Sequence, residues 1–249
     1  MRELEGKVAL VTGGARNIGR AIAIDLAEAG AGVVVNTRHS VDLAKETVEH
    51  ILGIGGRAIL CRADVTDPKA VQGMVDEAIG AFGGIDILVN NAAVRKEALV
   101  DSISFAEWRE VLSIMLDGAF LCTQACLPSM RSRGGASIVN IGGLTGHTGA
   151  AQRVHVVTGK AGLAGFTKAL AHDLAADGIT VNCVVPGLIE TDRGGTSPPV
   201  AVHHIERKKL LGRKGKPEEV AAMVRYLCGP RARYVTGQSL HVNGGIYMP

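Results

Sequence analysis

The first segment that could do chemistry is a glycine-rich turn at residues 12–19, which read TGGARNIG. It lies where a short apolar run gives way to a helical pattern. Glycines let the backbone turn tightly and approach a pyrophosphate, and a helix N-terminus offers free N–H groups and a positive dipole. The turn therefore predicts a dinucleotide site held by Gly13, Arg16, Asn17, Ile18 and Gly19.

The end of the next apolar run indicates which dinucleotide would bind. An NAD site carries an acidic residue there, which binds the ribose 2′-hydroxyl. Residues 36–40 read NTRHS instead, so Arg38 lies in this region without a carboxylate, while Arg16 lies in the glycine turn. Two arginines would neutralise a 2′-phosphate. The sequence therefore favours NADP(H) over NAD(H), although Arg38 as a solvated loop charge stays an alternative.

The elements that must position this turn follow a regular alternation. We expect strands at 7–12, 32–36, 58–61, 85–90, 136–141, 179–185 and 239–242, and helices at 18–29, 41–52, 68–82, 105–131, 151–176 and 217–228. The strand runs are apolar throughout, which is typical of a sheet covered on both faces. The pattern predicts one α/β domain over residues 1–249, a Rossmann-type doubly wound, mostly parallel seven-stranded sheet with helices on both faces.

One long irregular stretch, about residues 187–215, follows a predicted strand's carboxyl end, where ligands of such sheets bind. We expect a lid there. Its basic cluster, with His203, His204, Arg207 and Lys208 among others, would suit an acidic substrate or carrier protein, although a solvated helix face explains it equally well.

Composition excludes several classes of function. The net charge of +3 and the 3% aromatic content argue against a nucleic-acid binder. Five cysteines without a C-x-x-C pair suggest buried small hydrophobes in a reducing compartment. We find no signal peptide and no membrane span, so we expect a cytoplasmic protein. No His and carboxylate cluster has ligand spacing, so we expect no catalytic metal.

Several further motifs, taken with the glycine turn, carry a family resemblance. They are DVTD at 64–67, NNAA at 90–93, the segment 186–191 with Ile189 and Thr191, and VNGG at 242–245. Over essentially its whole length the chain resembles the short-chain dehydrogenase/reductase family, most closely the subgroup that includes 3-oxoacyl-carrier-protein reductases. The resemblance implies cofactor contacts from Asp64, Val65, Asn91, Ala92, Ala93, Lys160, Ile189 and Thr191. It departs from the family at Asn17, where glycine is usual, but asparagine tolerates positive φ well.

The same resemblance exposes a second departure, at the catalytic positions. The family reduces carbonyls with a Tyr-x-x-x-Lys pair on one helix, a serine after the preceding strand and often an asparagine. In this sequence Lys160 is retained, but Val156 stands at the tyrosine position, Gly143 at the serine position and Met115 at the asparagine position. A general acid typically contributes about 10²–10⁴-fold. The resemblance therefore implies a retained cofactor site beside a degenerate catalytic tetrad.

Other side chains could supply acid–base chemistry. His155 precedes Val156, although five residues place it about 140° from Lys160 around a helix, so a shifted helix start would be needed to aim it inward. His147 follows the serine position, and Arg153 could clamp an anion. For each of the three, a surface or capping role is the alternative.

Three functions therefore remain open. The first is an NAD(P)(H)-dependent oxidoreductase acting on an unknown carbonyl or alcohol with a substituted proton relay. The second is a non-redox enzyme, of lyase or isomerase type, that uses histidine acid–base chemistry. The third is a catalytically inactive nucleotide-binding protein. We expect a small-molecule substrate, with an anionic one among the candidates. The resemblance also implies a homotetramer formed through the helices at 105–131 and 151–176.

Overall fold

The computed structural model describes residues 2–192 and 210–249. Its centre is a seven-stranded sheet in the order β3-β2-β1-β4-β5-β6-β7, with every neighbouring pair parallel. The strands are β1 Val8–Val11, β2 Gly32–Thr37, β3 Arg57–Arg62, β4 Ile87–Asn90, β5 Ser137–Ile141, β6 Thr180–Pro186 and β7 Ser239–Val242. The predicted doubly wound fold is confirmed.

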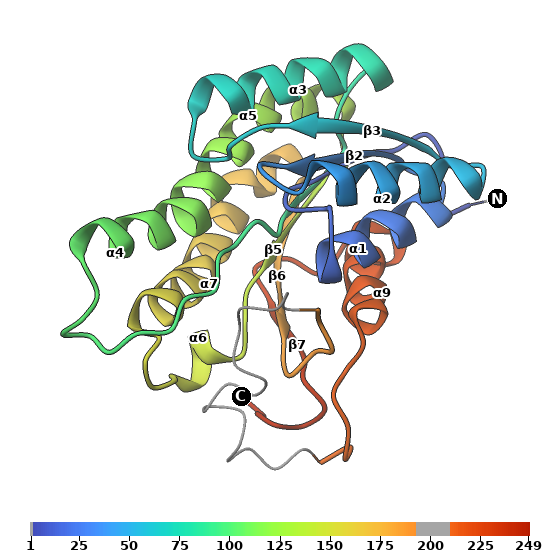
Figure 1. Ribbon diagram of the computed structural model, residues 1–249. Helices are drawn as coiled ribbons and strands as arrows, with labels where there is room; N and C mark the ends of the chain where they lie inside the picture. Colours follow the sequence, from blue (N-terminus) through green and yellow to red (C-terminus); the bar gives the residue numbers. More distant parts are fainter. Residues whose placement is uncertain (1, 193–209) are drawn as a thin grey trace.

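Helices cover both faces of this sheet (Figure 1). On one face lie α1 Asn17–Glu28, α2 Val41–Gly53 and α9 Pro217–Cys228. On the other lie α3 Pro68–Phe82, α5 Gly118–Arg133 and α7 Val154–Leu174, with α4 Phe105–Leu112 packed against α7. The other helical segments in the described residues are short: the π-helical turn Ser113–Asp117, α6 Thr145–Thr148 and the 3₁₀ turns Ala175–Asp177 and Pro230–Ala232.

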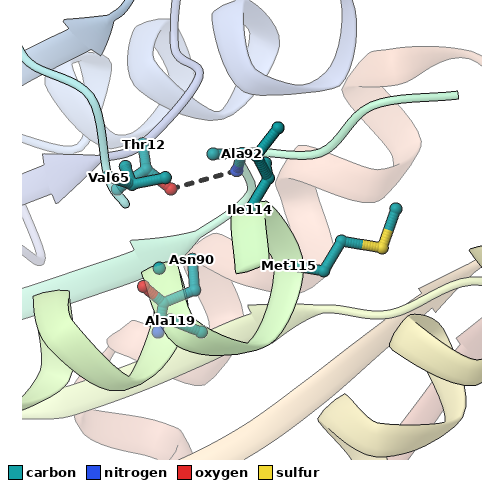
Figure 2. A pocket seen from close by; sticks show the side chains of 8 residues that line it. Thr12, Val65, Asn90, Ala92, Ile114, Met115 and Ala119 are labelled. Atoms are coloured by element: carbon teal, nitrogen blue, oxygen red, sulfur yellow. Dashed lines mark hydrogen bonds between the residues drawn. The ribbon is translucent and has the colours of Figure 1, made fainter. Parts of the chain in front are cut away.

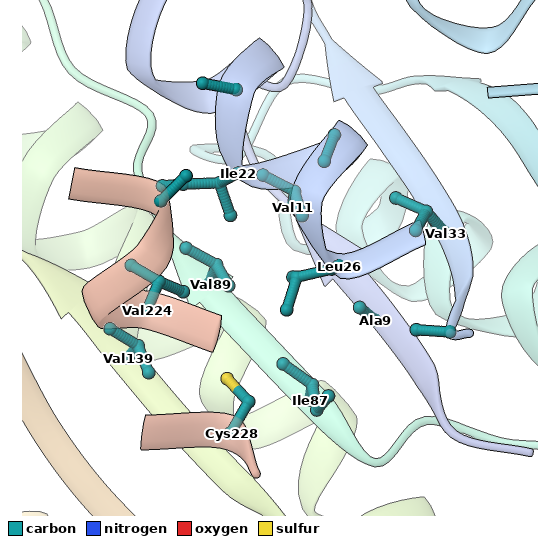
Figure 3. Packing of buried hydrophobic residues seen from close by; sticks show 14 of the residues in the cluster. Ala9, Val11, Ile22, Leu26, Val33, Ile87, Val89, Val139, Val224 and Cys228 are labelled. Atoms are coloured by element: carbon teal, nitrogen blue, oxygen red, sulfur yellow. The ribbon is translucent and has the colours of Figure 1, made fainter. Parts of the chain in front are cut away.

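Successive strand residues point to opposite faces, which explains why the strands are apolar throughout. In β1, Ala9 and Val11 join the core under α1 and α9, whereas Leu10 joins the core under α3 and α5. Figure 3 shows the first of these cores, where Ile22 and Leu26 of α1 meet Val224 of α9 over the sheet. The two cores hold the sheet between its helical layers, and this packing determines where the ends of the strands lie.

The crossover pattern determines where a ligand can bind. The chain moves from β1 outward to β2 and β3, then returns to the other side of β1 to form β4. The connections after β1 and β4 therefore diverge to opposite faces and leave a crevice at their carboxyl ends. The glycine turn follows β1 and the 91–104 segment follows β4, so both lie at this crevice.

Two predicted helices differ in the structure. The segment predicted as one helix at 105–131 contains a π-helical turn, Ser113–Asp117, between α4 and α5. The helix predicted from residue 151 begins only at Val154, because Gln152 adopts a positive φ angle of 59° that does not fit a right-handed helix. The short helix α6 has no counterpart in the predicted elements.

The predicted lid is described only at its ends. Residues 193–209, which include most of its basic cluster, lie outside the described residues. The ends run side by side: Ile189 and Gly215 form a parallel bridge, and the Glu190 N–H donates to the Gly215 carbonyl at 2.8 Å. Arg213, at the returning end, donates two 2.7 Å hydrogen bonds to the Glu219 carboxylate.

The helical run Phe105–Arg133 is long and apolar enough to cross a membrane by length and composition alone, with a mean hydropathy of 1.5 in its most apolar window. Core helices of layered domains meet the same criterion, and α5 packs against α3 and β4 in this fold. The five cysteines are all free and buried, as expected, and burial raises the pKa of each thiol.

Candidate active site

The glycine turn has the backbone geometry that a phosphate-binding turn needs. Gly13 and Asn17 adopt positive φ angles of 62° and 52°. A Cβ on Gly19 would collide with the Gly13 carbonyl oxygen, so only glycine lets α1 start this close to the turn. Asn17 is the first residue of α1, and the helix N-terminus therefore opens onto the crevice. The positive φ expected of Asn17 is confirmed.

Side chains from neighbouring strands hold this turn in place. Thr12 Oγ1 accepts hydrogen bonds from the N–H groups of Asn91 and Ala92 at 2.9 and 3.0 Å. The Asn91 amide in turn donates to the carbonyls of Thr12 and Gly13 at 2.9 and 3.0 Å. Asn36, at the end of β2, accepts from Gly13 N–H at 3.3 Å. The turn is therefore tied to β4 on one side and β2 on the other.

Asn17 adds a contact that the sequence did not predict. Its side-chain amide donates to the Asp192 carbonyl and accepts from the Asp192 N–H, both at 2.9 Å. This pair joins the glycine turn to the segment that follows β6. A glycine at position 17 could not make either bond.

The region that selects the dinucleotide is basic, with one carboxylate nearby. Arg38 Nη1 lies 3.2 Å from Asp64 Oδ2, and Arg16 is exposed at the N-cap of α1. Although partial burial disfavours the charged form of Asp64, hydrogen bonds from Thr66 and the charge of Arg38 hold its pKa below the usual value. The carboxylate in this region thus comes from the loop after β3, and not from the end of β2.

The residues present fit a dinucleotide. The Thr191 hydroxyl is buried, and within the described residues it has no hydrogen-bond partner, as expected of a group that waits for a ligand. Val65 and Ile189 are buried, Ile18, Asn91 and Ala92 are half-buried, and Ala93 is exposed at the crevice end of β4. With the glycine turn, Arg16, Arg38 and Asp64, these residues would hold the cofactor.

Lys160, in α7, lies next to this candidate cofactor-binding site. Its ammonium donates a 2.7 Å hydrogen bond to the Ile141 carbonyl at the end of β5. Burial lowers its pKa to about 8, and the positive charges of Arg95 and Arg153 act in the same direction. Near neutral pH the amine is therefore mainly protonated, but it gives up its proton far more readily than an exposed lysine.

The three substituted catalytic positions surround Lys160. A Cβ on Gly143 would lie 3.5 Å from Lys160 Cγ and Cδ, so a small side chain fits there without a clash. Val156, one turn before Lys160, packs with Met115 and Val111 in a small apolar cluster that Val94 borders. Met115 Sδ also lies against Gly159 of α7. Apolar contacts therefore lie at the positions where the family resemblance implies hydroxyl and amide groups.

Figure 2 shows a small cavity between the glycine turn and the π-helical turn. Its lining comprises Thr12, Val65, Asn90, Ala92, Ile114, Met115, Gly118 and Ala119. Asn90 donates to Asn140 at 2.9 Å, and Asn140 donates to Thr167 at the same distance. Asn90 Oδ1 is buried and has no hydrogen-bond partner within the described residues. Asn90, Asn140 and Thr167 thus form a chain of hydrogen bonds, which no pattern in the sequence indicated.

The candidate histidines take up two different places. His155 is fully buried, with Nε2 3.2 Å from Glu107 Oε1 of α4, so its ring points toward α4. His147 lies in α6, shortly after Gly143 in the chain, with its ring centroid 4.6 Å from His241 and 6.1 Å from Tyr247. Burial lowers the pKa of His147, and the charge of Lys168 adds to this. Among the described residues, neither ring forms a hydrogen bond with Lys160.

Arg153 forms the N-cap of α7 and is only 7% exposed. Its Nε lies 3.9 Å from Glu97 Oε1 in the segment after β4. Among the described residues, no group of three or more His, Cys, Asp or Glu side chains could hold a metal ion.

These features define a class of protein, an α/β domain that binds a nicotinamide dinucleotide at the carboxyl ends of β1 and β4. A family model described as enoyl-(acyl carrier protein) reductase matches residues 13–247. The chain belongs to the short-chain dehydrogenase/reductase family of NAD(P)-dependent oxidoreductases, as its motifs predicted.

Individual relatives agree with this assignment. The chain is 42% identical over 246 residues to the 3-oxoacyl-[acyl-carrier-protein] reductase FabG of Aquifex aeolicus, which covers 98% of this chain and 99% of the relative. It is 40% identical over 250 residues to the FabG of Vibrio cholerae, with 98% and 99% covered.

Solved structures show the same fold. A short-chain dehydrogenase from Burkholderia cenocepacia in complex with NADP superimposes with a TM-score of 0.91 at 36% identity, covering 98% of this chain and 99% of that one. A blue fluorescent protein from a metagenomic library in complex with NADPH gives 0.91 at 36% identity, covering 99% and 100%.

Proposed function

We propose that this protein binds NADP(H) in preference to NAD(H) and uses it on a small carbonyl or alcohol substrate without a tyrosine proton donor. The observation that carries the proposal is the contrast around Lys160. On one side lies the candidate cofactor-binding site, and on the other lies the apolar contact between Val156 and Met115. Two solved relatives that bind NADP or NADPH support the choice of cofactor.

In this proposal, different residues of the chain would contact different parts of the cofactor. Arg16 and Arg38 offset the charge of a 2′-phosphate, while the free N–H groups at the start of α1 face the pyrophosphate. Thr191 offers its buried hydroxyl to the carboxamide end. When bound, the nicotinamide supplies or accepts a hydride.

Proton transfer is where this chain differs. Lys160 can hold a proton at Nζ near neutral pH, since its pKa is about 8. Val156 and Gly143 hold no proton, and Met115 offers no donor. We therefore expect slow carbonyl reduction, in which the proton comes from Lys160, from water or from the substrate itself.

The experiment that tests this proposal has two stages. NADPH and NADH are titrated into the protein while the nicotinamide fluorescence is followed, and the complex is then mixed with a panel of carbonyls. We expect saturable binding with a lower Kd for NADPH than for NADH, together with slow but measurable oxidation. Equal affinities would refute the cofactor preference.

A non-catalytic nucleotide-binding protein is the second candidate, because Val156 and Met115 pack as an ordinary core contact would. Tight NADPH binding with no oxidation over the whole panel would favour it over the first.

We also propose that the chain forms a homotetramer. Phe105 and Phe120, on the helices of the 105–133 run, are 76% and 50% exposed and would supply apolar surface to a contact between subunits. Light scattering of the purified protein tests this directly, and a monomeric mass at micromolar concentration would refute it.

A further inference from the structure

The loop after β3 carries a carboxylate that is held in one orientation. Asp64 Oδ1 accepts a hydrogen bond from the Thr66 N–H at 3.0 Å and a second one from the Thr66 hydroxyl at 2.8 Å. These bonds fix one oxygen of the carboxylate against its own loop. The other oxygen, Oδ2, therefore faces the loop that follows β2.

Asp64 Oδ2 meets the arginine to which the proposed function assigns the 2′-phosphate. Arg38 Nη1 lies 3.2 Å from it. The backbone of Arg38 is held from the same direction, because Arg62 at the end of β3 donates from Nε to the Arg38 carbonyl at 3.3 Å. The guanidinium thus has an anionic partner before a cofactor arrives.

A 2′-phosphate would have to share this guanidinium with Asp64. The side chain of Arg38 is 48% exposed, and an ion pair this exposed is weak, so a doubly charged phosphate can displace the carboxylate. Thr66 keeps Asp64 in place when this happens. A phosphate on the same guanidinium would then lie within about 10 Å of the carboxylate, the Debye length at 0.1 M salt, and the two anions would repel each other.

We propose that Asp64 is a specificity-determining residue that competes with the 2′-phosphate for Arg38 and so limits the preference for NADPH over NADH. This inference rests on the proposed function, in which Arg38 binds the 2′-phosphate. Asp64 acts through Arg38 and is therefore a positioning residue. NADH has a hydroxyl group at the 2′ position, so the competition weakens the binding of NADPH alone.

The test compares wild-type protein with Asp64→Asn, which keeps an oxygen for the Thr66 donors and removes the charge. Fluorescence titration gives the Kd of NADPH and of NADH at about 0.05 M and about 1 M KCl. At low salt we expect NADPH to bind the variant about threefold to tenfold more tightly, and NADH to bind within about twofold of wild type. The gain should shrink at 1 M, where the Debye length is about 3 Å.

Several results would overturn the inference. A Kd for NADPH that does not change, or equal changes for both dinucleotides, would show that Asp64 does not act on the 2′-phosphate. Weaker binding of NADPH alone would show that Asp64 orients Arg38 for the phosphate and does not compete with it. A gain of the same size at both salt concentrations would exclude an electrostatic cause. Binding of NADH by Asp64→Asn serves as the check that the variant is folded.

A second pair of variants tests whether Asp64 acts through Arg38. In the Arg38→Gln background, Asp64→Asn should give a smaller gain for NADPH, because no guanidinium is left to compete for. An equal gain in both backgrounds would overturn this part of the inference. Asp173→Asn, at an exposed position in the last turn of α7, is the matched control for the loss of one negative charge and should leave both Kd values within about twofold.

The inference and the proposed function fail in different ways. The ratio of the two Kd values in the wild type tests the preference for NADP(H), whereas the change of this ratio in Asp64→Asn tests the competition. A preference for NADPH that appears only in Asp64→Asn would refute the first and support the second. A wild-type preference that Asp64→Asn leaves unaltered would support the first and overturn the second.

Discussion

The two halves of the crevice are built in opposite ways. On the side of β1 and β4, Thr12 and Asn91 hydrogen-bond to each other's backbone and Asn36 accepts from the Gly13 N–H, so polar contacts hold the nucleotide turn. On the side of β5 and α7, Val156 and Met115 meet in an apolar contact. The comparison shows polar hydrogen bonding on the nucleotide side and apolar packing at the positions where we propose that the family's proton-transfer groups are replaced.

The same contrast appears in how each side tolerates change. A Cβ on Gly19 would collide with the turn, whereas a Cβ on Gly143 would rest in ordinary contact with Lys160. The nucleotide turn therefore admits one residue type at a key position. On the catalytic side, position 143 admits a small side chain as well as glycine.

The largest effect should come from restoring the missing groups. The triple variant Met115→Asn, Gly143→Ser, Val156→Tyr should raise carbonyl reduction by about 10²–10⁴-fold, the usual contribution of a general acid. Met115 is included because its side chain packs in the cluster that a tyrosine must enter. Steady-state oxidation of NADPH measures the gain. The same variant with Lys160→Met is the control, and an equal rate in both would show that the tetrad was not rebuilt.

The next effect concerns the pH dependence of stability. The folded-state pKa of Lys160, about 8, lies below the ordinary lysine value, so between these values the unfolded chain binds the extra proton. Wild-type stability should therefore rise from pH 8 to pH 10.5, by ~3 kcal/mol relative to Lys160→Met. Below pH 8 the difference should be flat. Urea unfolding of both proteins at pH 7, 8, 9 and 10 measures this difference in the free energy of unfolding. A difference that does not change with pH would contradict a buried lysine that loses its proton near pH 8.

A somewhat smaller effect should appear in cofactor preference. Arg38→Asp should weaken NADPH binding by about 10–100-fold, because it removes a charged hydrogen bond and adds repulsion. NADH, which lacks the 2′-phosphate, should lose far less. Fluorescence titration measures both, with Arg57→Gln at the start of β3 as an exposed control. A similar loss for both dinucleotides would mean that Arg38 does not select between them.

The smallest effect concerns the contact between the glycine turn and the segment after β6. Asn17→Gly keeps the positive φ but removes both hydrogen bonds to Asp192. Each bond contributes about 1 kcal/mol, so amide exchange at Asp192 should accelerate by about fivefold to thirtyfold. Hydrogen exchange followed by NMR measures this. Unchanged protection at Asp192 would show that other contacts hold the segment.

The sequence predicted the elements well because their signals are local. Asp67 followed by Pro68 marks the start of α3, and the structure shows Asp67 accepting from the N–H groups of Lys69 and Ala70. The start of α7 was placed too early because the positive φ of Gln152 leaves no signal in the residue type. Local patterns therefore predict most helices and miss those whose ends depend on tertiary contacts.

The candidate site was predictable only where residue type carries the chemistry. The glycine turn, Arg38 and Lys160 could be identified from the chain alone. The orientation of His155 toward Glu107 and the contact of Asn17 with Asp192 join residues that are distant in sequence. No spacing rule reports such contacts, because they depend on how distant segments of the chain pack against one another.

One measurement tests the central claim most directly, a single-turnover comparison of wild-type and triple-variant protein, each saturated with NADPH and mixed with the same carbonyl. The absorbance of the nicotinamide band reports hydride transfer, and its amplitude reports how much cofactor was bound. We predict equal bound NADPH in the two proteins and a rate about 10²–10⁴-fold lower in the wild type. The account would be contradicted if the wild type did not bind NADPH, or if its rate equalled that of the variant.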